Sequence, residues 1–215
     1  ERLEALKAAT RVCLLREEED GSWTTYSGLA GYLEAHLRTQ TVNEVVYPEP
    51  SPLPWDQKPY DLWPYQQKIV DSLLAVRHGR VESATGTGKS LALMYLVKKL
   101  GLKTVGMAPS NSISDQLYRL FVKHLGKKYV GKYFAGRKEA GKLVVIGSAQ
   151  SLTRVTEKSG DYQLLKGTQV FVSDESHMTP ATTLQKVCFG VLAQAPYSFF
   201  FSATQMRGDG AGLLL

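Results

Sequence analysis

The stretch that decides the fold runs from Ser83 to Ser90 and reads Ser-Ala-Thr-Gly-Thr-Gly-Lys-Ser. Its glycines, Gly86 and Gly88, allow a tight turn in which successive backbone N–H groups converge on phosphate oxygens. Lys89 supplies a positive charge for the outer phosphates, and the hydroxyl of Ser90 is a suitable Mg²⁺ ligand. The stretch therefore predicts a phosphate-binding loop, although Ser83 stands where the full motif begins with glycine.

The residues on either side of this loop fit a strand before it and a helix after it. Residues 79–82 are strand-like, and residues 91–100 are apolar at helical spacing. A helix that begins at the loop directs its N-terminal dipole and its free N–H groups at an anion. Nucleotide contacts are therefore expected from Thr85, Gly86, Thr87, Gly88, Lys89 and Ser90.

Downstream of the loop, apolar strands alternate with helices. The strands are expected at residues 103–108, 142–146, 169–173 and 197–201. A helix is expected over residues 112–125, with Ser112 or Ser114 as its N-cap. This alternation predicts an α/β fold whose mostly parallel sheet is covered by helices on both faces. Ligands of such sheets bind beyond the carboxyl ends of the strands, where the polar clusters of this chain lie.

Two adjacent carboxylates follow one of these strands. Asp174 and Glu175 come directly after the apolar run 170–172, 85 residues beyond Lys89. At such a position Asp174 can hold Mg²⁺ together with Ser90, while Glu175 orients and deprotonates an attacking water. The pair therefore predicts phosphoryl-transfer chemistry, whereas an Asp-Glu pair away from such a loop is usually a solvated turn.

The chain before the loop divides into two further parts. Residues 1–47 are expected to form a small acidic α/β module, in which Asp20-Gly21 predicts a hairpin between strands at 11–15 and 23–26. Residues 48–61 are rich in proline and predict a stiff, extended linker. Residues 62–215 then form the nucleotide-binding domain. We interpret residues 1–47 as an accessory module that docks a protein partner.

Charge is distributed unevenly along the chain. Residues 1–62 contain 6 Lys and Arg against 11 Asp and Glu, whereas residues 91–150 contain 11 against 2. No apolar run is long enough to cross a bilayer, and two cysteines are too few for a disulfide framework or a zinc site. We therefore expect a soluble, intracellular protein with one surface that faces a polyanion.

The basic charge is concentrated between residues 123 and 142. Seven cations in this segment stand against Glu139 alone, and they are Lys123, Lys127, Lys128, Lys132, Arg137, Lys138 and Lys142. The segment could grip a nucleic-acid backbone, with stacking support from its aromatic residues Tyr129, Tyr133 and Phe134. It could equally be an exposed basic loop and strand whose aromatic residues belong to the core. Among these cations, Lys127, Lys128 and Lys132 are our candidate phosphate contacts.

A Tyr-Gln pair precedes the loop at the start of a helix expected to run from Pro64 through Val76. The side-chain amide of Gln66 offers a donor and an acceptor that match an adenine edge, and Tyr60 and Trp63 could pack on the base. A helix N-terminus without a ligand is the alternative reading.

Taken in order, these motifs resemble those of superfamily 2 DExH-box helicases and translocases. The loop resembles motif I, Asp174-Glu175-Ser176-His177 resembles motif II, and Ser202-Ala203-Thr204 resembles motif III. Tyr65-Gln66, Pro109-Ser110 and Ser148 to Ser151 are similar to the shorter elements between and before them. The resemblance covers about residues 60–210. Residues 207–210 are similar to the repair and branch-migration branch of the UvsW-type and XPB-like enzymes.

This resemblance implies a RecA-like domain with ATP and Mg²⁺ as ligands, and it implies roles for further residues. His177 would couple the nucleotide site to motif III, through which Ser202 and Thr204 link hydrolysis to movement. The residues expected to contact the phosphates of one strand are Pro109, Ser110, Ser148 and Gln150. The family also uses a second RecA-like domain, which we expect to be missing from a chain that stops at Leu215. The fragment alone should therefore hydrolyse ATP poorly.

The sequence thus predicts an ATP-dependent nucleic-acid helicase or translocase, with DNA favoured over RNA. One alternative is the motor of a restriction or remodelling complex that tracks duplex without separating its strands. Another is a non-hydrolysing nucleic-acid-binding module that kept the fold.

Overall fold

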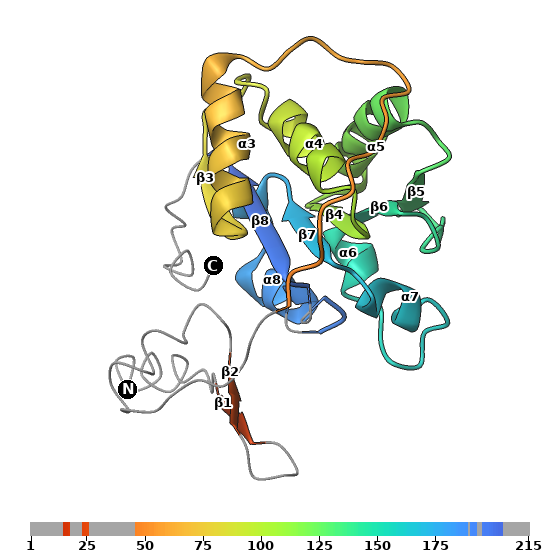
Figure 1. Cartoon of the computed structure of the whole chain (residues 1–215). Helices are drawn as coiled ribbons and strands as arrows, with labels where there is room; N and C mark the ends of the chain where they lie inside the picture. Colours follow the sequence, from red (N-terminus) through yellow and green to blue (C-terminus); the bar gives the residue numbers. More distant parts are fainter. Residues whose placement is uncertain (1–14, 18–22, 26–45, 189, 193–194, 204–215) are drawn as a thin grey trace, which may run out of the picture. The chain divides into compact units, whose positions relative to one another are not determined.

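A computed structural model describes residues 15–17, 23–25, 46–188, 190–192 and 195–203 of the chain (Figure 1). The chain divides into two compact units, Glu1–Val45 and Val46–Leu215. In the first unit, strand β1 (Leu15–Glu17) pairs antiparallel with β2 (Trp23–Thr25). The predicted hairpin is confirmed in its pairing, but its first strand begins at Leu15 instead of ending there. The other elements predicted for residues 1–45 lie outside the described residues.

The second unit is built on a six-stranded sheet in which every pair is parallel, in the order β3-β8-β7-β4-β6-β5. Its strands are β3 (His78–Glu82), β4 (Thr104–Ala108), β5 (Val130–Tyr133), β6 (Val144–Ser148), β7 (Val170–Ser173) and β8 (Tyr197–Ser202). This confirms the predicted α/β fold and all five predicted strands. Because all strands point the same way, the sheet has an amino edge, where they begin, and a carboxyl edge, where they end.

Helices cover both faces of this sheet (Figure 1). One face carries α3 (Pro64–Val76), α4 (Lys89–Leu100) and α5 (Asn111–Leu125). The other carries α6 (Ala149–Leu152), α7 (Tyr162–Lys166) and α8 (Ala181–Cys188). No helix in the described part of the chain is long and apolar enough to cross a membrane.

The helices form two cores with the sheet, one on each face. Successive side chains of a strand point alternately into one core and the other. In β7, Val170 and Val172 pack towards α3–α5, while Phe171 between them packs towards α6–α8. In β8, Phe199 and Phe201 face the first core and Phe200 faces the second. Successive strand residues point to opposite faces, so an unbroken apolar strand serves two cores at once.

Residues 48–61, predicted as a linker, lie in the same unit as the sheet and pack along it; we name them the strap. The backbone N–H of Ser51 donates to Leu100 O over 2.8 Å, and that of Asp56 donates to His124 O over 2.8 Å. Leu53 is only 7% exposed within the first core. The strap is extended, as its prolines require, but it stays on the domain because its N–H groups pair with carbonyls that helices α4 and α5 leave free at their C-termini.

The structure corrects two further details. The N-cap of α5 is Ser110, whose hydroxyl accepts from Ile113 N over 3.3 Å, and not Ser112 or Ser114. Tyr133 and Phe134 are buried at 3% and 2% exposure, so they belong to the core and cannot stack on bases. Of the two readings of the basic segment, the structure therefore favours core aromatic residues for these two positions.

Candidate nucleotide and nucleic-acid site

The phosphate-binding loop joins β3 to α4 at the carboxyl edge of the sheet. Gly86 and Gly88 have φ values of 85° and 76°, a left-handed region that favours glycine. A Cβ atom at Gly88 would lie 2.4 Å from Nε2 of Gln66, so a larger residue there would displace the Gln66 side chain. The loop therefore depends on these glycines for both conformation and close packing.

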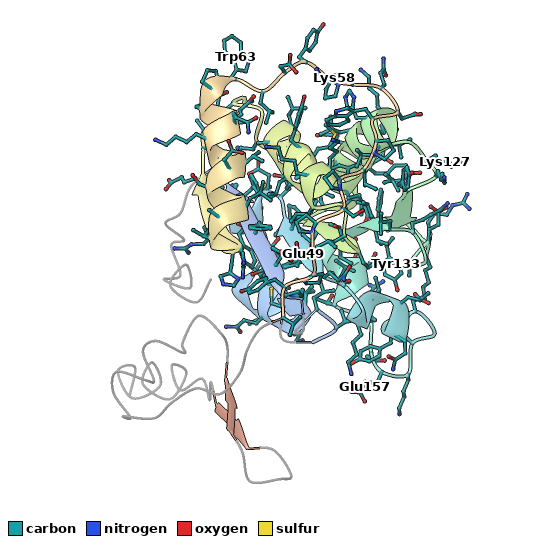
Figure 2. The ribbon with its side chains drawn as sticks, in the orientation of Figure 1. Glu49, Lys58, Trp63, Lys127, Tyr133 and Glu157 are labelled. Carbon is teal, nitrogen blue, oxygen red and sulfur yellow. The ribbon has the colours of Figure 1, made fainter. Side chains whose placement is uncertain are left out.

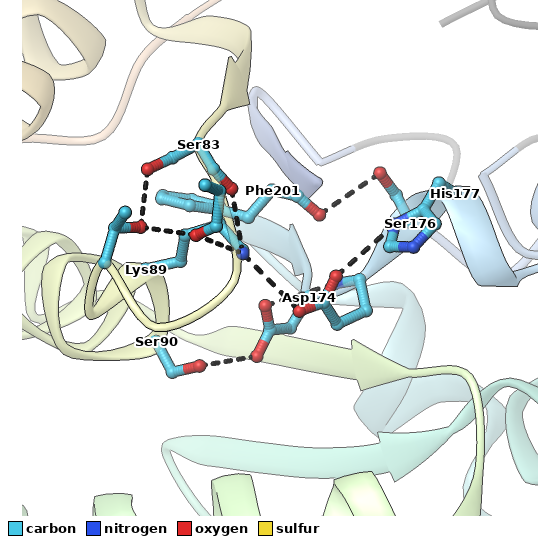
Figure 3. Close-up of polar contacts among 10 residues, drawn as sticks. Ser83, Lys89, Ser90, Asp174, Ser176, His177 and Phe201 are labelled. Carbon is cyan, nitrogen blue, oxygen red and sulfur yellow. Dashed lines mark hydrogen bonds and ion pairs between the residues drawn. The ribbon is translucent and has the colours of Figure 1, made fainter. Parts of the chain in front are cut away.

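Lys89 begins α4 and is directed into the loop (Figure 3). Its side chain is 4% exposed, and its ammonium donates to Ser83 O over 2.9 Å and to Ala84 O over 3.2 Å. Glu175 Oε1 lies 3.6 Å from the same nitrogen. Three oxygens thus hold one buried cation at the position where the loop would meet the outer phosphates.

Ser90 and Asp174 meet across the cleft between α4 and β7, as Figure 3 shows. The Ser90 hydroxyl donates to Asp174 Oδ2 over 2.8 Å. Asp174 is 3% exposed, and burial raises the pKa of its carboxyl group. The hydrogen bond from Ser90 opposes this rise in pKa, and the charge of Glu175 adds to it.

This pair fits the chemistry of a Mg²⁺ site. Among the described residues, no group of three or more His, Cys, Asp and Glu side chains gathers around one point. Mg²⁺ bound to nucleotides commonly takes only one or two protein oxygens and completes its shell with water and phosphate. Ser90 and Asp174 supply that number of oxygen ligands.

Glu175 and His177 form the second half of this cluster. Glu175 Oε2 lies 3.3 Å from His177 Nδ1, but the two atoms do not have hydrogen-bond geometry. The backbone of Glu175 is left-handed, with φ 49° and ψ 44°, which is uncommon outside glycine. Ser176 next to it donates to Phe201 O over 3.3 Å and so fixes the turn to β8 (Figure 3).

The end of β8 touches the loop directly. Ser83 N donates to Ser202 O over 3.0 Å, so motif III begins beside motif I. Thr204 and residues 207–210 lie outside the described residues, and their predicted roles stay predictions.

Two residues were not recognised as loop supports in the sequence. The Ser83 hydroxyl lies 2.6 Å from that of Thr87, which in turn donates to Ala84 O over 2.7 Å. The Tyr65 hydroxyl donates to Thr87 O over 2.7 Å, next to a 2.9 Å bond from Gln66 Nε2. Ser83 thus has a bracing role that glycine could not fill. In the sequence, only the resemblance of the Tyr-Gln pair indicated a role for Tyr65.

Gln66 lies beside the loop in a way that the sequence did not predict. It is 3% exposed, and its Oε1 accepts from Trp63 N over 2.9 Å. Its amide is therefore already bonded on both sides to the protein. Tyr60 and Trp63, by contrast, are 93% and 67% exposed and are available to a base.

A cavity of about 460 Å³ opens between the loop, motif II and α5. Its polar wall includes Thr85, Ser90, Asp174, Glu175 and His177, and its apolar wall includes Ile113, Leu117, Leu120 and Met178. The predicted metal ligands and the predicted base therefore face one space.

The candidate nucleic-acid contacts follow β4 and β6, which are neighbours with Ala108 opposite Ser148. Ser110 and Gln150 are exposed, whereas Ser148 is 1% exposed and accepts from Ser151 N over 3.3 Å as the N-cap of α6. The structure brings these residues to one edge, but it gives the Ser148 hydroxyl a capping role.

The three candidate lysines are separated. Lys132 lies within β5, where its ammonium is 2.9 Å from Asp115 Oδ1 and 4.3 Å from the centre of the Phe134 ring. Lys127 and Lys128 are exposed in the turn before β5, at the amino edge of the sheet. Lys127 and Lys128 therefore lie apart from the paired Lys132, and the predicted contacts of the three lysines with phosphates stay a prediction.

Fold and site together define a RecA-like P-loop domain, the first motor domain of superfamily 2 helicases. The chain belongs to the family described as "Type III restriction enzyme, res subunit", which matches residues 59–207. No curated protein sequence matches the chain. The predicted superfamily is thus confirmed, as is its helicase-type motor fold.

Solved structures share this fold at low sequence identity. The UvsW helicase from bacteriophage T4 matches with a TM-score of 0.66 and 13% identity, over 98% of this chain and 90% of that one. A hypothetical ATP-dependent RNA helicase from Sulfolobus tokodaii matches with a TM-score of 0.55 and 19% identity, over 67% of this chain and 47% of that one. The Sulfolobus solfataricus SWI2/SNF2 ATPase core in complex with dsDNA matches with a TM-score of 0.55 and 17% identity, over 72% of this chain and 34% of that one.

Proposed function

We propose that the protein is an ATP-dependent helicase or translocase that couples ATP hydrolysis to movement on nucleic acid, with DNA as its track. The observation that carries this proposal is that Ser90, Asp174 and Glu175 line one cavity and that Lys89 lies 3.6 Å from Glu175, although 84 residues separate Ser90 from Asp174. A module that only binds nucleic acid would have no use for the Ser90–Asp174 pair or for the Lys89–Glu175 contact.

Each residue has a separate part in hydrolysis. Lys89 turns from the loop carbonyls to the outer phosphates, and the loop N–H groups bind the remaining phosphate oxygens. Ser90 and Asp174 would hold Mg²⁺, which would supply positive charge beside the phosphates. Glu175 accepts the proton of the attacking water. His177 beside it couples the nucleotide site to Ser202 and Thr204 of motif III. Tyr60 and Trp63 pack on the base. A second RecA-like domain completes the cleft.

Nucleic acid is expected at the carboxyl edge, on Pro109, Ser110, Ser148 and Gln150, where contacts to phosphates position the strand without reading its sequence. DNA is favoured because one fold relative is described in complex with dsDNA and another is the T4 UvsW helicase. We propose the UvsW-type and XPB-like branch because residues 207–210 are similar to it, with support from the T4 UvsW helicase as a fold relative. Residues 1–45 would then be an accessory unit for a protein partner.

The test is binding of a fluorescent ATP analogue in the presence of Mg²⁺. Loss of the charged contacts of one ammonium is expected to weaken binding at least about tenfold in Lys89→Ala. Lys98→Ala, on the same helix, is the matched control. Equal affinity of Lys89→Ala and the unchanged protein would refute the nucleotide site.

The family match favours a second candidate, a duplex-tracking motor of a restriction complex. The two functions separate in a pair of assays on the full-length protein. A helicase releases a labelled strand from a forked duplex, whereas a duplex-tracking motor displaces only a third strand bound in the groove of an intact duplex.

A further inference from the structure

We propose that the amino edge of the sheet carries a second nucleic-acid-binding surface, so that the protein holds two nucleic-acid segments at opposite edges of one domain. Its residues are the amino-edge cluster, which we define as Lys123, Lys127, Lys128 and Lys142. The proposal rests on the proposed function only in assigning the carboxyl edge to the first segment.

The path of the chain gathers these four lysines at one end of the sheet. Helix α5 starts after β4 at the carboxyl edge and returns the chain to the amino edge, over about 22 Å for its 15 residues. Lys123 lies in its last turn, and Lys127 and Lys128 follow it. Lys142 precedes β6, which pairs with β5 at Val130–Val144, and its ammonium donates to Lys128 O over 3.2 Å.

The charges of this cluster are left for an external partner. Among the described residues, Lys99 pairs with Asp71 and Lys132 with Asp115, but no ion pair involves any member of the cluster. The strap N–H groups of Asp56 and Gln57 bond to His124 O at the C-terminus of α5. Asp56 lies beside Gly126, where an added Cβ would be 3.3 Å from its Cγ, and it forms no ion pair with the cluster among the described residues.

The partner that this surface fits is a phosphate backbone. Lys127 and Lys128 are exposed, and Lys127 projects from the periphery of the domain in Figure 2. The aromatic residues at the far end of β5 are buried in the core, and Tyr129 beside the cluster is partly buried with the Lys128 ammonium 5.3 Å from its ring centre, so the surface offers mainly charge. Point charges of this kind contact phosphates irrespective of sequence, and their affinity falls steeply with salt.

The two edges are far enough apart to act separately. Lys127, labelled in Figure 2, precedes β5, and Tyr133, also labelled there, is its last residue, so the length of the strand, about 10 Å, lies between the two edges. The remaining cations of the basic segment, Arg137 and Lys138, are exposed and follow Tyr133 at the carboxyl edge. Six of the seven cations therefore form two groups at opposite ends of the edge strand β5, and the seventh, Lys132, lies within the strand and pairs with Asp115.

The experiment is a bridging assay with the full-length protein at low salt. A biotinylated duplex on beads captures the protein, and retention of a second, fluorescent duplex is measured. Lys127→Ala/Lys128→Ala/Lys142→Ala is expected to retain at least fivefold less of the second duplex, while the corresponding triple arginine variant retains it. In direct binding, the slope of log Kd against log salt should fall by about three, one per phosphate contact removed.

Other outcomes are decisive as well. Unchanged bridging by the triple alanine variant would overturn the inference. Loss of bridging in the triple arginine variant as well as in the triple alanine variant would also overturn it. So would binding of poly-glutamate, but not of DNA, that depends on the cluster. A single duplex that spans both edges would give the alanine variant weaker binding of the first duplex and no bridging in any protein. Failure of the nucleotide site is distinguished because ATP-analogue binding is measured on the same variants and does not depend on this cluster.

Discussion

The two edges of the central sheet hold their charges in opposite ways. At the carboxyl edge, Lys89 and Asp174 are buried, and each is held by short contacts to neighbours on other elements. At the amino edge, Lys127 and Lys128 are exposed and, among the described residues, form no ion pair. Buried charge is costly unless it is paired, so the first edge fixes its groups within hydrogen-bond distances. Exposed charge is screened by salt and lies on mobile side chains, which suits attraction of a polyanion irrespective of its sequence.

This difference predicts where a conservative substitution matters most. Glu175→Gln preserves size but removes the group that accepts a proton, and we expect turnover to fall about 10²–10⁴-fold. Binding of the ATP analogue should be retained, since the group acts mainly in the transition state. Glu157→Gln, an exposed carboxylate labelled in Figure 2, is the control in steady-state ATPase assays of the full-length protein. Lost affinity with intact turnover would give Glu175 another role.

The two edges also differ in that the strap packs at the amino edge, and its packing can be tested apart from the charges. Leu53→Ala removes a side chain that is 7% exposed in the first core, and we expect the free energy of unfolding to fall by about 2–5 kcal/mol. Pro52→Ala, at an exposed strap position, is the control. Denaturation by urea measures both. A change below about 0.5 kcal/mol for Leu53→Ala would show that the strap is not fastened as described.

Asp174 and Asp115 should make the stability of the folded protein depend on pH in opposite directions. Burial raises the pKa of Asp174 above 3.8, so the folded protein loses stability as pH rises through that raised pKa. Hydrogen bonds from Lys132 and Arg119 lower the pKa of the half-buried Asp115 below 3.8, so its contribution is present above 3.8 and is lost as pH falls further. Near pH 7, Asp174→Asn should therefore raise the unfolding temperature and Asp115→Asn should lower it.

The Asp174 difference should shrink as the pH falls through its raised pKa, whereas the Asp115 difference should shrink only below pH 3.8. Thermal unfolding of the two variants and the parent from pH 8 to about pH 2 measures both differences without Mg²⁺ or nucleotide. Equal signs for the two variants near pH 7 would contradict the assignment of one carboxylate destabilised by burial and one stabilised by its cationic partners. A tenfold difference in proton affinity between folded and unfolded states corresponds to about 1.4 kcal/mol.

The smallest expected effect concerns the bracing of the loop. Tyr65→Phe removes the hydroxyl that donates to Thr87 O, while Gln66 keeps its own bond to the same oxygen. One neutral hydrogen bond is worth about 0.5–1.5 kcal/mol, so ATP-analogue affinity should fall about two- to tenfold. Tyr118→Phe on α5 is the control. If the two variants bind equally, the Tyr65 contact does not support the loop.

The sequence predicted the elements that have strong local patterns. The loop, its flanking strand and helix, and four further apolar strands were found because continuous apolar runs and glycines leave few alternatives. Strand β5 was missed because Gly131 and Lys132 interrupt its apolar pattern, and Lys132 is tolerated there only through Asp115. Helices α6 and α7 have four and five residues, too few for a helical period to be recognised.

The misread parts depend on contacts between distant segments. Proline content predicted an extended backbone for the strap, but not that Ser51 would meet Leu100 or that Asp56 would meet His124. The basic segment was treated as one surface because its cations are close in sequence. Strand β5 sends them to different edges, and only the topology shows this. The sequence likewise did not show the bonds of Gln66 to Thr87 O and Trp63 N, and its adenine contact stays a prediction.

The left-handed backbone of Glu175 has a consequence for anyone who evolves this protein in the laboratory. A non-glycine residue at φ 49° and ψ 44° costs on the order of 1–3 kcal/mol, and glycine would remove most of that cost. A glycine at position 175 would also lack the carboxylate that faces Lys89. A library screened for thermal resistance alone would therefore enrich inactive proteins at this position, and a screen for turnover would reject the same substitution. Selection for heat resistance and selection for activity act here in opposite directions, on a single residue.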